Sequence, residues 1–129
     1  MKSVNESGRS QKLIVKKSIF ICTIYKVSNK EEAVQFLAKV KTEFRNATHN
    51  AYAYRVRTSI LWEESSDDGE VKGCAGKPII DLLRKQNLTN LLVIVTRFYG
   101  GIKFGPGRLI RNYSKSVNDL IGIIGLEEL

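Results

Sequence analysis

The sequence predicts an α+β fold in which a four- to five-stranded mixed sheet carries helices on one face. Segments rich in β-branched and aromatic residues alternate with segments of helical periodicity, and neighbouring strand segments are close enough in sequence to form hairpins. The 129 residues contain no internal repeat and no linker, so they provide for one core of ordinary size. We expect residues 1–12 to be a flexible N-terminus and residues 13–129 to form a single domain.

Composition excludes several classes of protein. Hydrophobic residues make up 43% of the chain and charged residues 26%, which is typical of globular domains and unlike disordered, fibrous or membrane-spanning chains. The longest apolar run, Leu91–Val95, is far shorter than the ~18 residues that span a bilayer, and residues 1–12 lack the apolar core of a signal peptide. We therefore expect a cytoplasmic protein without membrane contact, whose cysteines stay reduced.

The first half of the chain carries clear strand and helix signals. Residues 13–27 are rich in β-branched types and are interrupted by Lys16–Lys17, which predicts a strand, a turn and a second strand. Ser28 followed by Glu31 fits a capping box, in which each side chain accepts a free backbone N–H of the other residue. An amphipathic helix over residues 29–44 should follow.

A half-buried strand is predicted over residues 50–57, because polarity alternates along this segment. Residues 59–63 could pair with it as a hairpin. The two expected faces hold Tyr52, Tyr54 and Val56 on one side and Ala53, Arg55 and Arg57 on the other.

The second half alternates glycine-rich loops with regular elements. A polar loop over residues 64–77 precedes a helix that begins near Pro78. Residues 91–96 are almost uniformly apolar, which predicts a central strand buried on both faces. A second glycine-rich loop follows at residues 99–107, and the last helix should run over about residues 106–121.

Basic residues and glycines gather after the predicted central strand. Glycines let a backbone approach a ligand, and the helix start that follows carries partial positive charge. Aromatic side chains interleaved with the cations can stack on unpaired bases. The alternative is a tight strand-to-helix turn with solvated cations and core aromatics. The candidate residues for binding an anion or nucleic acid are Arg97, Gly100, Gly101, Lys103, Gly105, Arg108 and Arg111.

Net charge and motif spacing narrow the classes of ligand that this loop could bind. Lys and Arg number 21 against 13 Asp and Glu, and the net charge of +8 favours polyanionic or acidic partners. Lys103 precedes Gly105 instead of following the glycines, so the loop is not a Walker A motif. Ile110 stands where a dinucleotide fingerprint needs its third glycine.

An acidic segment precedes the second predicted helix and leaves alternatives open. Its spacing does not match a calcium loop, and one histidine with two separated cysteines does not suit zinc, so we expect neither metal nor cofactor. Asp67 or Asp68 could perform acid–base chemistry, or the segment could neutralise the basic loop. Cys74 could be a nucleophile with His49 as its base, because a helix start lowers a thiol pKa. The acidic residues are Glu63, Glu64, Asp67, Asp68 and Glu70.

Five short motifs follow one another along the chain. They are Thr-His-Asn-Ala-Tyr-Ala-Tyr at 48–54, Ser-Asp-Asp-Gly-Glu at 66–70, Ala-Gly-Lys-Pro at 75–78, Thr-Arg-Phe-Tyr-Gly-Gly-Ile-Lys at 96–103, and Arg111 with Tyr113. In this order the motifs resemble the IMPACT N-terminal domain family, which includes the bacterial YigZ proteins. The resemblance covers roughly residues 15–120 and implies a fold like domain 2 of ribosomal protein S-five. It also implies a link to translation, because eukaryotic members are translational regulators that compete for a ribosome-associated activator of a stress kinase, and nucleic-acid binding has been suggested for bacterial members.

These observations favour a non-catalytic, translation-linked binding module. Its basic loop would contact RNA, the ribosome or a ribosome-associated protein. The alternative is a hydrolase-type enzyme that acts on a phosphorylated small molecule through His49, Asp67 and Asp68. A homodimer could form through the apolar segment 120–126. The residues expected to line or brace the binding surface are His49, Asn50, Asp67, Asp68 and Glu70.

Overall fold

The apolar strand β7 (Leu91–Phe98) lies at the centre of the sheet, as its composition predicts. In this computed structural model, which describes residues 1–129, β7 is flanked by β4 (Ser18–Lys26) and β5 (His49–Arg57). All pairings in the six-stranded sheet are antiparallel, so the expectation of a mixed sheet is wrong. β4 and β5 run parallel to each other and are kept apart by β7. The outer strands are β6 (Leu61–Ser66) beside β5, and β2 (Gly8–Arg9) and β3 (Leu13–Val15) beside β4.

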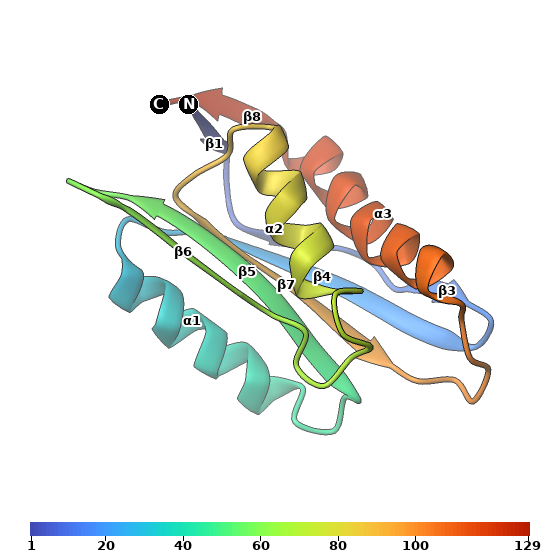
Figure 1. The fold of residues 1–129 in the computed structure, drawn as a ribbon. Helices are drawn as coiled ribbons and strands as arrows, with labels where there is room; N and C mark the ends of the chain where they lie inside the picture. Colours follow the sequence, from blue (N-terminus) through green and yellow to red (C-terminus); the bar gives the residue numbers. More distant parts are fainter.

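Helices cover both faces of this sheet. Figure 1 shows α1 (Lys30–Glu43) on one face and α2 (Gly76–Lys85) and α3 (Pro106–Ile124) on the other. The α+β class is confirmed, whereas the expectation of helices on one face is wrong. Successive residues of a strand point to opposite faces, so a strand that is apolar throughout needs cover on both. β7 gives Leu92 and Ile94 to the cluster with α1, and Leu91, Val93 and Val95 to the cluster beneath α2 and α3.

The alternation predicted for residues 50–57 is confirmed, although both of its faces are buried. Tyr52, Tyr54 and Val56 pack with α1, while Ala53 belongs to the opposite cluster. Arg55 is only 7% exposed. Its Nε donates to Glu63 at 2.7 Å and its Nη1 donates to the carbonyl oxygen of Leu88 at 3.0 Å. These partners satisfy a charge that the polarity pattern had assigned to solvent.

Two local signals show how closely sequence spacing fixes a boundary. The predicted turn at Lys16–Lys17 is confirmed, and both residues have positive φ, 46° and 66°, as two-residue hairpin turns require. The cap of α1 lies one residue later than expected. The Glu32 backbone N–H donates to Asn29 Oδ1 at 2.8 Å, and Glu32 Oε1 accepts from the Ser28 N–H at 3.2 Å. Asn is as good a cap as Ser, so Asn29 can take this role in place of Ser28.

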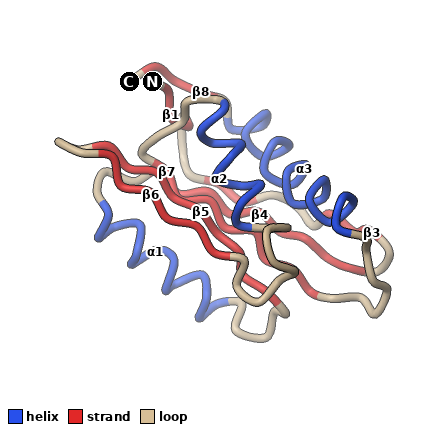
Figure 2. Tube along the Cα trace, viewed as in Figure 1, coloured by secondary structure: helices blue, strands red, loops and turns tan.

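Both ends of the chain join one small sheet, so part of the segment 1–12, expected to be flexible, lies in regular structure. β1 (Lys2–Val4) pairs with β8 (Leu126–Glu128), so the termini lie side by side (Figure 2). Val4 is fully buried and provides the apolar anchor that the polar composition of residues 1–12 concealed. In the apolar segment 120–126, Ile123 is 78% exposed, while its other Ile and Leu side chains are buried or half-buried. None of the helices has the length and apolar character needed to cross a membrane.

Two glycine-to-alanine changes test this packing. Gly122 lies inside α3, where a Cβ would meet nothing within 4 Å, so Gly122→Ala should raise the unfolding free energy by about 0.5–1 kcal/mol.

Gly76→Ala should lower the unfolding free energy by about 1–3 kcal/mol. Its Cβ would lie 2.6 Å from the carbonyl carbon of Ser66. Urea unfolding measures both changes, and a harmless Gly76→Ala would contradict the close approach of α2 to β6.

Candidate functional site

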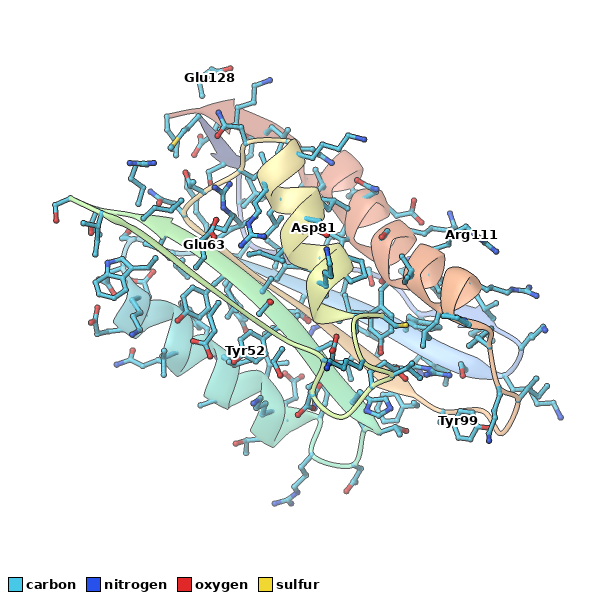
Figure 3. All side chains as sticks on the ribbon, in the orientation of Figure 1. Tyr52, Glu63, Asp81, Tyr99, Arg111 and Glu128 are labelled. Carbon is cyan, nitrogen blue, oxygen red and sulfur yellow. The ribbon has the colours of Figure 1, made fainter.

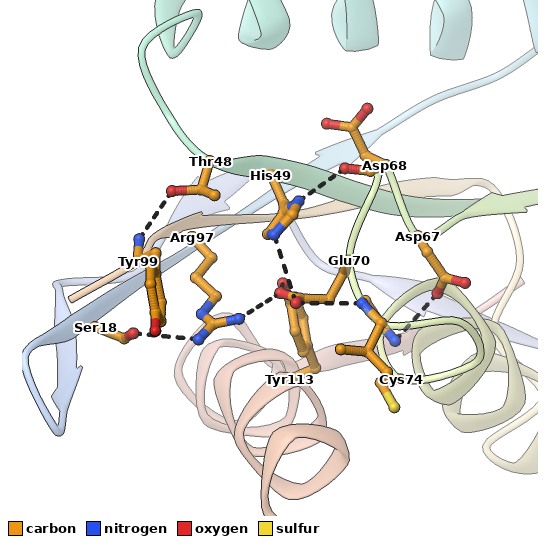
Figure 4. A network of polar contacts seen from close by, with 12 residues as sticks. Ser18, Thr48, His49, Asp67, Asp68, Glu70, Cys74, Arg97, Tyr99 and Tyr113 are labelled. Carbon is orange, nitrogen blue, oxygen red and sulfur yellow. Dashed lines mark hydrogen bonds and ion pairs between the residues drawn. The ribbon is translucent and has the colours of Figure 1, made fainter. Parts of the chain in front are cut away.

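A buried ion pair lies where β4, β5 and β7 meet the loop before α2 and the start of α3. Arg97 extends from β7, and its Nη1 donates to Glu70 Oε2 at 2.7 Å (Figure 4). The hydroxyl of Tyr113, on α3, donates to the same oxygen. Arg97 is 4% exposed, Glu70 8% and Tyr113 0%. Burial raises the pKa of the Glu70 carboxyl, but donation from Tyr113 and Arg97 outweighs burial and leaves this pKa below its usual value.

Arg97 is enclosed by aromatic rings as well as by polar partners. Its Nη2 donates to Ser18 Oγ at 3.3 Å. The guanidinium carbon lies 5.2–5.6 Å from the centroids of the Phe104, Tyr99 and Phe20 rings. Its Nε is buried without a hydrogen-bond partner. The three rings therefore contribute cation–π attraction to the guanidinium group.

His49 links this ion pair to the acidic loop. Its Nε2 lies 3.5 Å from Glu70 Oε1, and its Nδ1 lies 2.9 Å from the carbonyl oxygen of Asp68. Because a carbonyl only accepts hydrogen bonds, Nδ1 carries a hydrogen. His49 is therefore held in one orientation by two residues of the loop.

The side chain of Asp67 holds the start of α2. Its Oδ1 accepts from the N–H groups of Ala75 and Gly76 at 3.2 and 2.8 Å, and its Oδ2 accepts from the Gly73 N–H at 2.9 Å. These N–H groups precede and begin α2, where a helix lacks internal acceptors. The carboxylate therefore satisfies the chain's own backbone, which does not favour acid–base chemistry.

Asp68 and Asn50 brace the neighbouring strand. Asp68 Oδ2 accepts from the backbone N–H of Asn50 at 2.7 Å. Asn50 Oδ1 accepts from the hydroxyl of Thr96 at 2.7 Å, and Asn50 Nδ2 donates to the carbonyl oxygen of Phe44 at 3.2 Å. Both residues, expected as supporting residues, have strong structural partners here.

The surroundings of Cys74 do not favour a nucleophilic role. Burial raises the pKa of the Cys74 thiol, and the nearby Asp67 and Glu70 charges raise it further. The helix start had predicted the opposite direction, but Asp67 already caps it. The thiol lies 3.8 Å from the carbonyl oxygen of Lys72, and His49 is bonded to the acidic loop instead. No three His, Cys, Asp or Glu side chains are grouped to hold a metal ion.

The four basic candidates do not converge on one point. Arg97 and Lys103 line a concavity of about 340 Å³, whereas Arg108 and Arg111 line another on the outer face of α3. Figure 3 shows Arg111 on α3 and Tyr99 in the loop after β7. Arg97 is buried, and the other three are exposed.

The glycines of the loop lie in different structural settings. A Cβ on Gly100 would lie 2.1 Å from the Lys17 carbonyl carbon, so this glycine lets the loop pack against the β3–β4 turn. Gly101 has a φ of 90°, which favours glycine. Gly105 is the N-cap of α3, with open space around it and no side-chain cap. The close packing at Gly100 brings Lys16 and Lys17 beside the loop, which sequence spacing did not indicate.

Sequence reasoning also missed Ser18 and the role of Tyr113. Ser18 is buried and its Oγ accepts from both Arg97 and the Gly100 N–H. Tyr113 lies on α3 and is fully buried. Its hydroxyl was the available signal, because a buried phenol needs a polar partner.

A sheet covered on both faces, with a buried ion pair beneath a glycine-rich loop, defines a small α+β domain with a polar centre at the strand ends. The chain belongs to the Impact N-terminal domain family, whose sequence model matches residues 16–121. This confirms the resemblance found in the motifs.

Named relatives support this assignment. The chain is 41% identical over 126 residues to IMPACT family member YvyE of Bacillus subtilis, covering 98% of this chain and 58% of the relative. It is 33% identical over 109 residues to IMPACT family member YigZ of Escherichia coli, covering 83% and 53%. The chain thus spans between half and three fifths of these relatives' length.

Solved structures share the fold. A crystal structure of a hypothetical protein superposes with a TM-score of 0.88 at 28% identity, covering 98% of this chain and 62% of the other. The two-domain translational regulator Yih1 superposes with a TM-score of 0.65 at 24% identity, covering 94% and 48%. The likeness to domain 2 of ribosomal protein S-five stays a prediction.

Removing one member of the ion pair should cost more than removing both. Glu70→Gln should lower the unfolding free energy by about 3–5 kcal/mol, because Arg97 stays buried without a counter-charge. Adding Arg97→Met should recover part of this loss. Asp81→Asn, in an exposed ion pair, is the control and should cost at most about 1 kcal/mol. Urea unfolding measures these free energies. If the double variant loses as much as the two single changes added together, the pairing is contradicted.

The lowered pKa of Glu70 also predicts a pH dependence. The ionised carboxylate stabilises the fold fully above its unfolded pKa of about 4.3, and this contribution is lost as pH falls through the lower folded-state pKa. Tyr113→Phe removes one donor, so the folded-state pKa should rise and the loss of stability in acid should become shallower. Thermal unfolding across this acid range measures the difference, and identical acid slopes would contradict the assignment.

Proposed function

We propose that this chain is a non-catalytic, translation-linked binding module that contacts RNA through exposed cations at one end of the sheet. The observation that supports this proposal most is that these cations have no acidic partner within 4.0 Å. The nearby carboxylates, by contrast, form hydrogen bonds or ion pairs with other groups of the chain. We call this set the basic rim: Lys16, Lys17, Lys103, Arg108 and Arg111.

The start of α3 gives this rim a preference for anions. The helix has no side-chain cap and no acidic residue in its first turn. Arg108 lies there instead, where a cation opposes the helix dipole at a cost of about 0.3–1 kcal/mol. A phosphate would reverse the sign of this interaction, since it attracts both the cation and the free N–H groups.

The link to translation comes from the family. Yih1, which shares the fold, is described as a translational regulator, but its 24% identity supports the fold alone. The RNA contact therefore rests on the basic rim, and ribosomal RNA in the cytoplasm is the partner proposed. A ribosome-associated protein is the competing partner, and nuclease treatment separates the two.

Two other expectations receive less support. A hydrolase would need a carboxylate free to face its substrate, and both oxygens of Asp67 accept backbone N–H groups. A homodimer through segment 120–126 would rest mainly on Ile123, because most of the segment packs within its own core.

Binding of a labelled single-stranded oligouridylate, followed by fluorescence anisotropy between about 50 and 200 mM salt, tests the proposal. For single strands, the slope of log K against log salt changes by about 0.7 for each phosphate contact. The double variant Arg108→Gln/Arg111→Gln should therefore reduce the slope by about 1.4 if both side chains contact phosphates.

The matched control is Lys39→Gln/Lys85→Gln, which removes the same charge from exposed, unpaired lysines on α1 and α2. It should leave most of the slope intact. An equal reduction by the control would attribute binding to net charge and contradict the rim. Absence of RNA binding at low salt, with nuclease-resistant capture of ribosomal proteins, would overturn the RNA contact in favour of a protein partner.

A further inference from the structure

The concavity beside Arg97 is a defined pocket, and the proposed role of the basic rim does not account for its presence. Its volume of about 340 Å³ is near the lower end of the ~300–1,000 Å³ typical of ligand sites. The strand ends, the acidic loop and the loop after β7 all contribute to its walls, as does Leu109 of α3. The lining residues used below are Thr48, His49, Arg97, Tyr99, Lys103 and Phe104.

We propose that this pocket takes one unpaired nucleotide of RNA, with the base stacked on Tyr99 and the phosphate near Lys103. This inference rests on the proposed function, and it adds a preference for single strands over duplexes. Bases in an A-form duplex are stacked and paired, so only a splayed base could enter.

Tyr99 is already positioned for stacking. Its backbone N–H donates to Thr48 Oγ1 at 2.9 Å, and the Arg97 guanidinium carbon lies 5.4 Å from its ring centroid. These contacts hold the residue in place, yet Tyr99 remains 44% exposed. A base that stacks on the exposed part of a fixed ring loses little additional side-chain freedom.

Charge within the pocket favours an anionic group such as a phosphate. Arg97 and Glu70 neutralise each other at its base. Lys103 has no ion-pair partner and supplies the remaining positive charge. A phosphate would meet this ammonium, while the hydroxyl of Thr48 and the ring of His49 offer further polar contacts at the wall.

An acidic protein segment is the competing occupant, but it would leave the aromatic surface unused. Tyr99 and Phe104 offer flat apolar area that a nucleobase covers and a carboxylate does not. The combination of a ring and a cation in one small concavity therefore points to a nucleotide.

Titrating the full chain with uridine 5′-monophosphate, uridine and inorganic phosphate, followed by amide chemical shifts of Gly69, Val71 and Gly101, tests the pocket. The monophosphate should bind more tightly than either fragment. Tyr99→Leu should weaken the monophosphate roughly 5- to 150-fold, the range of one lost base stack, while Tyr99→Phe should keep the affinity. Lys103→Gln should weaken the monophosphate and leave uridine unchanged.

Trp62→Leu is the matched control. Trp62 is another exposed aromatic residue with a cation over its ring, Lys30 at 4.8 Å, and it lies on β6 away from the pocket. It should leave monophosphate binding unchanged. Phosphate alone binding as tightly as the monophosphate, or equal weakening by Tyr99→Leu and Trp62→Leu, would overturn the nucleotide pocket.

Comparison of single-stranded oligouridylate with a duplex separates the two proposals. Preference for the single strand that Tyr99→Leu abolishes supports the pocket. Salt-dependent binding of both forms with equal affinity, unaffected by Tyr99→Leu, would overturn the pocket and leave the basic rim standing. Failure of every RNA to bind at low salt would overturn the proposed function, whereas monophosphate binding would still report on the pocket by itself.

Discussion

The ion pair between Glu70 and Arg97 is the contact on which the arrangement of the strand ends depends. Either charge, buried without the other, would carry a desolvation cost of several kcal/mol. The acidic loop therefore has to lie over β7 for the two charges to be paired out of water. Tyr113 donates to the same carboxylate and fixes α3 to it. A loop, a central strand and a helix thus take their relative positions from the hydrogen bonds of one side chain.

Residues of catalytic type have structural roles here, because their polar atoms form hydrogen bonds with the chain itself. A general acid or base needs an atom that faces its substrate. The carboxylate of Asp67 is surrounded by the N–H groups of residues 73, 75 and 76, and Asp68 holds the backbone of Asn50. Among the basic candidates Arg97, Lys103, Arg108 and Arg111, the acidic segment therefore neutralises only Arg97. The neighbouring cations remain available, which separates a buried, neutral centre from a charged surface.

The sequence predicted local features better than the contacts between distant ones. The turn at Lys16–Lys17, the alternation in β5 and the central position of β7 follow from patterns within a few residues. The second covered face was missed because Arg55 looked solvent-exposed, although Glu63 and Leu88 satisfy it inside the fold. The sequence suggested that the acidic segment could neutralise basic residues, but it did not indicate that Glu70 pairs with Arg97, because the two residues are 27 positions apart. Only close packing, as at Gly100, brings the β3–β4 turn beside the basic loop.

Burying Arg97 divides the attraction of this surface for an anionic chain into two parts. The exposed cations act over about a Debye length, which is roughly 10 Å at 0.1 M salt, and their effect weakens as salt rises. The aromatic surface acts only on contact and depends little on salt. Had Arg97 remained exposed, it would have added to the first part. Paired with Glu70 and packed against Tyr99, it instead orders the ring and so contributes to the second. In the proposed RNA contact, selectivity is therefore set by what fits against Tyr99, and the surrounding cations set how readily the strand arrives there.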